Sequence, residues 1–231
     1  MAFRAPNIND VSSFGIADFR YEVPAYDLKP ETSLNKEIGY KIKYDRFSSA
    51  LHLFHNKLND LIANVPAEFQ GMDSLDGYKV YQRENINEAV IYGGELELEG
   101  KLTKALIAYG NISYTYGQNI SKNEPMRRIP PLNGRLGLRT IFAQHFSFSA
   151  EWVVAAAQER LSSGDIADDR IAIGGTPAWN IINAYAGYDH KYFTINASLQ
   201  NIGDNAYRTH GSGIDGIGRS FWVSLKININ P

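Results

Sequence analysis

The chain ends with SFWVSLKININP (residues 220–231), in which apolar and polar side chains alternate from one residue to the next. Because successive side chains of a β-strand point to opposite sides, this segment predicts a strand with one apolar and one mainly polar face. The apolar face carries Phe221, Val223, Leu225, Ile227 and Ile229, and the other carries Trp222, Ser224, Lys226, Asn228 and Asn230. An apolar face of this kind packs either in the core of a soluble sandwich or against lipid.

The composition is compatible with both environments and excludes some functions. The 231 residues include 23 lysines and arginines against 25 aspartates and glutamates, so the basic excess expected of a nucleic-acid-binding protein is missing. No stretch approaches the roughly 18 apolar residues of a transmembrane helix, but a membrane β-barrel never forms such a run. Cysteine is absent, which excludes disulfides and thiol chemistry.

The same alternation recurs upstream and predicts about ten strands. It is clear in residues 36–45, 89–102, 145–154 and 192–201. It is less regular in 104–117, 132–143 and 179–189, ambiguous in 48–62, and allows a short strand within residues 1–5. Many of these segments are close to the roughly ten residues that a tilted membrane strand needs.

The connections between these strands alternate between short and long. Tight turns are expected near 44–48, 100–104, 143–145 and 189–191, and long polar loops at 6–30, 63–77, 118–131, 159–178 and 203–218. In an up-and-down antiparallel sheet this places every short turn on one side, as in outer-membrane barrels with short periplasmic turns and long extracellular loops. A Greek-key sandwich has no reason to keep this asymmetry.

Aromatic side chains near the strand ends favour lipid as the partner of the apolar faces. They are Tyr40, Tyr44, Phe142, Phe146, Tyr188, Tyr192 and Trp222. Membrane barrels carry such aromatic girdles at both interfaces, and ordinary aromatic core residues are the alternative interpretation of this feature. The sequence therefore predicts an all-β fold, a portion of an antiparallel up-and-down transmembrane β-barrel with about ten strands.

Four segments, in this order, resemble the TonB-dependent outer-membrane receptors. They are FRAPNIND (residues 3–10), LKPETSLNKEIGYK (28–41), RRIPPLNGRLGLR (127–139) and NIGDNAYRTHGSGIDGIGRSFWVSLKI (201–227). The resemblance implies an N-terminal plug domain, a TonB-binding segment and a barrel of 22 strands. Residues 1–231 match about the last ten strands, so we expect the C-terminal portion of such a barrel, without plug, N-terminal strands or signal peptide. The implied location is the outer membrane of a Gram-negative bacterium.

No catalytic or metal-binding constellation stands out, so an enzyme is not expected, and neither is a cofactor. His52 and His55 are three residues apart on a strand and therefore face opposite sides, which excludes a metal pair there. FRAP-type segments occur in haem receptors, but no histidine lies between Pro6 and Leu28, which disfavours haem. The acidic segment DIADDR (165–170) is expected to be a solvated loop rather than a cation site.

The resemblance implies a receptor for a scarce ligand, above all an iron–siderophore or related iron complex. Its implied partners are outer-membrane lipid and lipopolysaccharide, the TonB complex through a plug, and the small-molecule ligand. For an anionic iron chelate, cations and hydrogen-bond donors should converge where the loops meet the lumen, because a guanidinium engages two ligand oxygens at once. The candidates are Arg127, Arg128, Tyr207, Arg208 and His210.

Three alternatives stay open at this point. Arg127 and Arg128 could instead snorkel at the lipopolysaccharide boundary. The whole chain could be a soluble all-β binding module, or a free-standing small porin of about ten strands. Dependence on detergent separates the soluble module from the two membrane proteins.

Overall fold

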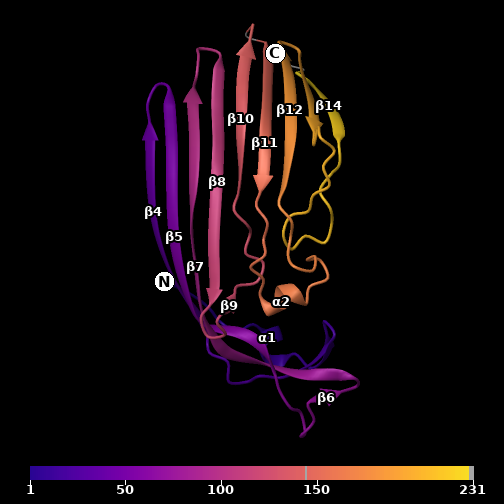
Figure 1. Cartoon of the computed structure of the whole chain (residues 1–231). Coiled ribbons are helices and arrows are strands. Elements are labelled where there is room, and N and C mark those ends of the chain that lie inside the picture. Colours follow the sequence, from indigo (N-terminus) through magenta and orange to yellow (C-terminus); the bar gives the residue numbers. More distant parts are fainter. Residues whose placement is uncertain (144, 229–231) are drawn as a thin grey trace. The chain divides into compact units, whose positions relative to one another are not determined.

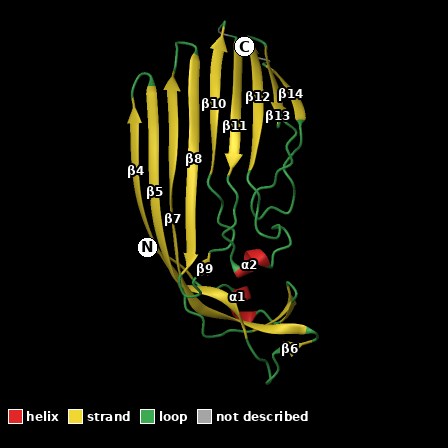
Figure 2. Ribbon diagram, in the orientation of Figure 1, coloured by secondary structure: helices red, strands yellow, loops and turns green. Residues whose placement is uncertain are grey.

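The computed structural model describes residues 1–143 and 145–228, and it is all-β, as the alternation predicts (Figure 1). Within this part of the chain, fourteen strands form one hydrogen-bonded sheet. Two short helices, α1 (Ile8–Ser12) and α2 (Ser163–Ile166), are drawn in red in Figure 2. Among the described residues, no helix has the length and apolar character needed to cross a membrane. The expected positions of Ile229 and Asn230 in the last strand lie outside the described residues.

Ten strands are neighbours across the sheet in chain order. They are β1 (Ala2–Arg4), β4 (Glu31–Lys43), β5 (Phe47–Pro66), β7 (Tyr78–Lys101), β8 (Leu106–Asn119), β10 (Asn133–Phe142), β11 (Phe146–Ala155), β12 (Trp179–His190), β13 (Phe193–Gln200) and β14 (Ser220–Ile227). Four short strands lie off this path: β2 (Gly15–Ala17), β3 (Arg20–Val23), β6 (Ser74–Leu75) and β9 (Glu124–Pro125).

The sheet differs from the prediction in strand number and in direction. The four additional strands all lie in segments expected to be loops, and β3 pairs with β7 in parallel, so the sheet is mixed rather than uniformly antiparallel. The reason is apolar burial: Tyr21 and Val23 of β3 are buried with Val80 of β7. The described strands do not close the sheet, because β1 and β14 stand at the two ends of the path.

The connections along the ten-strand path alternate in length, as predicted. Short connections follow β4, β7, β10 and β12: turns at 44–46, 102–105 and 191–192, and the few residues between β10 and β11. Long segments at 5–30, 67–77, 120–132, 156–178 and 201–219 precede β4, β7, β10, β12 and β14. Each strand pair joined by a short turn is therefore a hairpin, and the long segments all follow the second strand of a hairpin or β1.

The chain divides into two compact units, which the strands β4, β5, β7 and β8 share. The first comprises Met1–Lys36, Phe54–Tyr92 and Gly117–Met126, and the second comprises Glu37–Leu53, Gly93–Tyr116 and the described residues from Arg127 onward. In the first unit a small apolar core of Tyr21, Val23 and Val80 is covered by Ala67, Phe69, Leu75 and Tyr78.

An ionic network around Asp10 fixes the start of the first unit. Asn7 and Asp10 form a capping box at the N-terminus of α1. The Asp10 carboxylate accepts hydrogen bonds from Arg4 Nη1 and Arg83 Nη1, each at 2.6 Å, and its side chain is only 4% exposed. Arg4 also donates to Glu31 at 2.6 Å, which ties the FRAPNIND segment to β4.

In the second unit the strand register confirms the expected apolar face. Phe221, Val223 and Leu225 of β14 pair with Leu199, Ala197 and Ile195 of β13, so these side chains share one side of the sheet. The three β14 residues are 67%, 59% and 61% exposed, and within the described residues no second sheet packs on them. An apolar face exposed over a whole strand is the expected surface of a lipid-facing sheet.

Candidate ligand-binding site

Three arginines of the second unit converge on one buried carboxylate. Arg127 Nη2, Arg128 Nη2 and Arg170 Nη2 donate to Asp168 Oδ2 at 2.7, 3.0 and 2.8 Å, and Arg170 Nε donates to Oδ1 at 2.7 Å. The Asp168 side chain is 4% exposed, whereas those of the arginines are 51%, 42% and 45% exposed. We call these four residues the arginine cluster.

The acidic segment DIADDR overlaps the end of α2 and supplies Asp168, the carboxylate that the arginines share. Ser162 and Asp165 form a capping box that starts α2, and Asp165 is buried with its carboxylate accepting from the backbone N–H of Arg128 at 3.1 Å. The described residues contain no group of three or more potential ligands that could hold a metal ion. The segment is thus not a solvated loop: its two buried aspartates fold against the arginines.

The arginine cluster keeps both positive charge and unused donors. Three guanidinium groups face two buried carboxylates, those of Asp165 and Asp168, so one positive charge is uncompensated. Each guanidinium has five N–H donors, of which Asp168 takes only one from Arg127 and one from Arg128. The remaining donors lie on half-exposed groups and can engage an anion.

His210 adjoins the arginine cluster from the last long segment. Its Nδ1 and Thr176 Oγ1 share a hydrogen bond of 2.9 Å, while the buried Nε2 has no hydrogen-bond partner within the part of the chain described. Burial lowers the pKa of His210, and nearby Arg128 lowers it further, although Asp165 and Asp168 oppose this. One ring nitrogen of His210 therefore stands beside the cluster without a hydrogen-bond partner among the described residues.

Buried Asn201 holds the segment that carries His210. Asn201 is 1% exposed, its backbone N–H donates to Asn183 Oδ1 at 2.9 Å, and its side-chain amide donates to the carbonyls of Asn205 and Ile217. Its φ of 48° lies in the left-handed region, which asparagine tolerates better than most residues. The two ends of the loop are thus tied to one side chain.

Tyr207 and Arg208 make their side-chain contacts with other residues than the arginine cluster. Arg208 Nε donates to Asp215 at 2.7 Å, and both groups are solvent-accessible. The Tyr207 ring packs on Trp179 at 4.7 Å between centroids and fills the space above Gly216. The structure therefore brings Arg127, Arg128 and His210 together, whereas Tyr207 contacts Trp179 and Arg208 pairs with Asp215.

Arg128 and His210 line one cavity of about 460 Å³, which we call the loop cavity. Its other lining residues are Asn111, Pro130, Pro131, Asn133, Gly134, Arg135, Val153, Val154, Ala155, Trp179 and Thr209. None of these is acidic, so the described lining is cationic, amide-rich and partly apolar. Two further cations, Arg170 of the arginine cluster and Arg135 of the loop cavity, were not among the candidates predicted from the sequence. For Arg135 the alternation in 132–143 was an available signal, because it shows which face of the strand the side chain is on.

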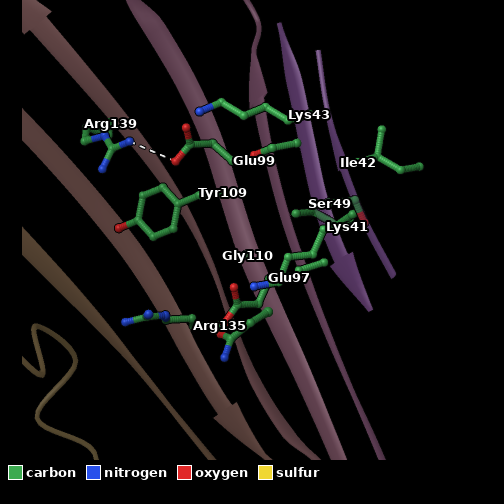
Figure 3. A pocket seen from close by; sticks show the side chains of 14 residues that line it. Lys41, Ile42, Lys43, Ser49, Glu97, Glu99, Tyr109, Gly110, Arg135 and Arg139 are labelled. Carbon is green, nitrogen blue, oxygen red and sulfur yellow. Dashed lines mark hydrogen bonds and ion pairs between the residues drawn. The ribbon is translucent and has the colours of Figure 1, made fainter. Parts of the chain in front are cut away.

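A second cavity, of about 690 Å³, lies on the polar face of the strands (Figure 3). We call it the strand cavity; its charged lining residues are Lys41, Lys43, Glu97, Glu99, Arg135 and Arg139. Arg139 Nη2 donates to Glu99 at 3.0 Å, and the Arg139 guanidinium carbon is 5.7 Å from the centre of the Tyr109 ring. Figure 3 shows the Tyr109 ring between Arg139 and Arg135.

Gly137 makes the position of Tyr109 possible. It pairs with Tyr109 across β10 and β8, and any Cβ at residue 137 would collide with the tyrosine ring. The ring therefore lies over the glycine, between the two arginines that precede and follow this glycine on the same face of β10.

Residues 1–202 match the family model for the TonB-dependent receptor-like β-barrel. The chain belongs to this family. The match places this TonB-dependent receptor segment in the outer membrane of a Gram-negative bacterium.

Named relatives of this TonB-dependent receptor segment include an iron-regulated outer membrane protein and a ferric enterobactin receptor. The iron-regulated outer membrane virulence protein of Vibrio cholerae is 28% identical over 97% of the chain and 35% of the relative. The ferric enterobactin receptor of Pseudomonas aeruginosa is 24% identical over 97% of the chain and 34% of the relative. The chain thus spans about a third of the length of these relatives.

Solved structures share the fold of this TonB-dependent receptor segment. The copper transporter OprC superposes with a TM-score of 0.78 at 22% identity, over 97% of the chain and 35% of OprC. A variant of the Pseudomonas aeruginosa ferric enterobactin receptor bound to enterobactin superposes with a TM-score of 0.75 at 22% identity, over 97% of the chain and 37% of the receptor.

Proposed function

We propose that residues 1–231 are the C-terminal portion of the barrel of a TonB-dependent receptor that imports an anionic iron chelate of the siderophore class. In this proposal the ten-strand path is an up-and-down part of a larger barrel, with short turns in the periplasm and long segments outside the cell. The remaining strands and a plug close the lumen, and the TonB complex acts through that plug. Lipid and lipopolysaccharide contact the apolar face. The chain's role is transport rather than catalysis.

The observation that carries the ligand class is the arginine cluster. Arg127, Arg128 and Arg170 are gathered by one buried carboxylate, keep a net positive charge and are half-exposed. Catecholate and carboxylate oxygens of an iron chelate match guanidinium donors in pairs. The cavity beside the cluster adds Trp179 as an aromatic surface and His210 Nε2 as an unsatisfied polar atom. The names of the relatives, which include an iron-regulated outer membrane protein and a ferric enterobactin receptor, agree with this ligand class.

The test is alanine substitution of Arg127, Arg128 and Arg170 in the complete receptor, followed by equilibrium binding of ferric enterobactin and ferric citrate. Losing one charge-assisted contact should cost about 1.5–3 kcal/mol, or roughly ten- to a hundredfold in affinity. Lys191→Ala, in the short turn at the opposite end of β12, is the matched control and should leave affinity unchanged.

One outcome would contradict the proposed site, and one further variant tests how far the site extends. Unchanged affinity in all three arginine variants, at matched surface expression, removes the arginine cluster from the site and leaves ligand contacts to the plug. Arg208→Ala decides whether the site extends to the Tyr207–Arg208 segment, whose role stays a prediction.

A further inference from the structure

The loop cavity and the strand cavity adjoin, because Asn111 and Arg135 line both of them. The two residues lie opposite one another on β8 and β10, so the wall that the two cavities share is one cross-strand residue pair. The loop cavity extends from that pair to Ala155 and Trp179, where β11 ends and β12 begins on either side of the long segment 156–178. The strand cavity extends in the other direction.

The strand cavity reaches the short-turn end of the strands. Lys43 is the last residue of β4 before the turn at 44–46, and Glu99 lies two residues before the end of β7. Arg139 follows Arg135 by four residues on the same face of β10, a distance of about 13 Å at the rise of a strand. The cations Arg128, Arg135, Arg139 and Lys43 therefore succeed one another from the loop end to the turn end.

The positive charge of the strand cavity exceeds its negative charge. Four cationic side chains, those of Lys41, Lys43, Arg135 and Arg139, line it with only two acidic ones, Glu97 and Glu99. Glu99 is paired with Arg139 at 3.0 Å, and Arg135 is 4.0 Å from Glu151. In the described part of the chain, neither Lys41 nor Lys43 has an ion pair within 4.0 Å.

We propose that Lys41, Lys43, Arg135 and Arg139 form a second anion-binding station on the lumen wall, which receives an anionic chelate from the loop cavity through Arg135. This inference rests on the proposed function and extends it from capture to passage. The Tyr109 ring between the two arginines offers a flat surface on which a planar ligand group stacks. Glu97 and Glu99 keep the station weaker than the loop cavity, as passage requires, because a site on a transport path must also release its ligand.

If the station exists, the surface affinity for the chelate and the rate of its energised uptake should respond to different substitutions. The double variant Lys41→Gln/Lys43→Gln in the complete receptor should leave the surface affinity for ferric enterobactin within twofold in de-energised cells. Its maximal rate of energised uptake per receptor should fall about tenfold, and Lys41→Arg/Lys43→Arg should restore it. Arg128→Ala should show the opposite pattern, with weaker surface binding. Lys104→Gln/Lys191→Gln, which removes two exposed cations from short turns, is the control and should change neither quantity.

Three results would overturn the station. The first is unchanged uptake by the double variant, and the second is an equal loss of affinity and uptake. The third is entry of vancomycin into de-energised cells carrying the double variant, which would show that the lysines hold the plug instead. Failure of the proposed function is visible separately, because the unsubstituted receptor would then neither bind nor import ferric enterobactin or ferric citrate.

Discussion

Replacing Asp168 with asparagine tests whether one buried charge holds the arginine cluster together. The substitution keeps the size of the side chain but leaves the guanidinium groups of Arg127, Arg128 and Arg170 facing one another without their common carboxylate. We expect the segment 156–178 to open more often, because mutual repulsion then replaces attraction.

The magnitude follows from the exposure of the partners. Removing one partner of a buried ion pair costs about 3–5 kcal/mol. The Asp168 side chain is 4% exposed, but the arginines are 51%, 42% and 45% exposed, so water screens the interaction and reduces its contribution. We therefore expect a loss of about 2 kcal/mol in the local opening free energy, equivalent to roughly thirtyfold in the opening equilibrium.

Hydrogen exchange followed by mass spectrometry, on the complete receptor in detergent, measures this change. Amides of 156–178 should lose about thirtyfold in protection in Asp168→Asn. Asp169→Asn is the matched control, because Asp169 is the exposed neighbour in the same segment. Equal protection in Asp168→Asn and the unsubstituted receptor, or an equal loss in Asp169→Asn, would refute the reasoning.

The remaining predictions concern the lipid face, the first unit and the strand cavity. Leu225→Arg should destabilise the folded receptor in lipid vesicles by about 2–4 kcal/mol, whereas Ser224→Arg, on the opposite face, should have a much smaller effect; equal effects in denaturant titrations would contradict the assignment of faces. Burial alone would raise the pKa of Asp10, but hydrogen bonds from Asn7 and Arg4 outweigh it and lower the pKa below 3.8. The stability that Asp10 contributes is therefore present above pH 3.8 and lost as the pH falls through its lowered pKa; hydrogen exchange in α1 should accelerate there, and Asp10→Asn should remove that pH dependence. Gly137→Val should displace the Tyr109 ring and slow energised uptake without weakening surface binding of ferric enterobactin; a normal uptake rate would show that the ring has no part in passage.

Local periodicity accounts for what could be predicted about the faces of the sheet. Side-chain direction in a strand depends only on position parity, so Phe221, Val223 and Leu225 are placed on one side by the sequence itself. The same parity puts Arg135 on the polar face with Arg139, and it separates His52 from His55. The positions of the polar and glycine-rich segments likewise predict the alternation of short and long connections.

The candidate site could be predicted only in part, because its contacts join segments far apart in the chain. Arg127 reaches Asp168 across 41 residues, and Thr176 reaches His210 across 34. Nothing in the local pattern of DIADDR indicates that Asp168 is buried beneath three arginines or that Arg170 belongs to the site. The contacts that Tyr207, Arg208 and His210 make also depend on how the loop folds around Asn201.

The sequence by itself determined most strands of the ten-strand path, their two faces and the resemblance to the family, since these depend on residue alternation and on short ordered motifs. Only the tertiary structure decided that β3 runs parallel to β7, that Asp168 gathers the arginine cluster, and that Arg135 joins two cavities. The physical reason is that burial and ion pairing between loops are set by the distances that folding creates. A strand's periodicity repeats every two residues and carries no information about which loop meets which.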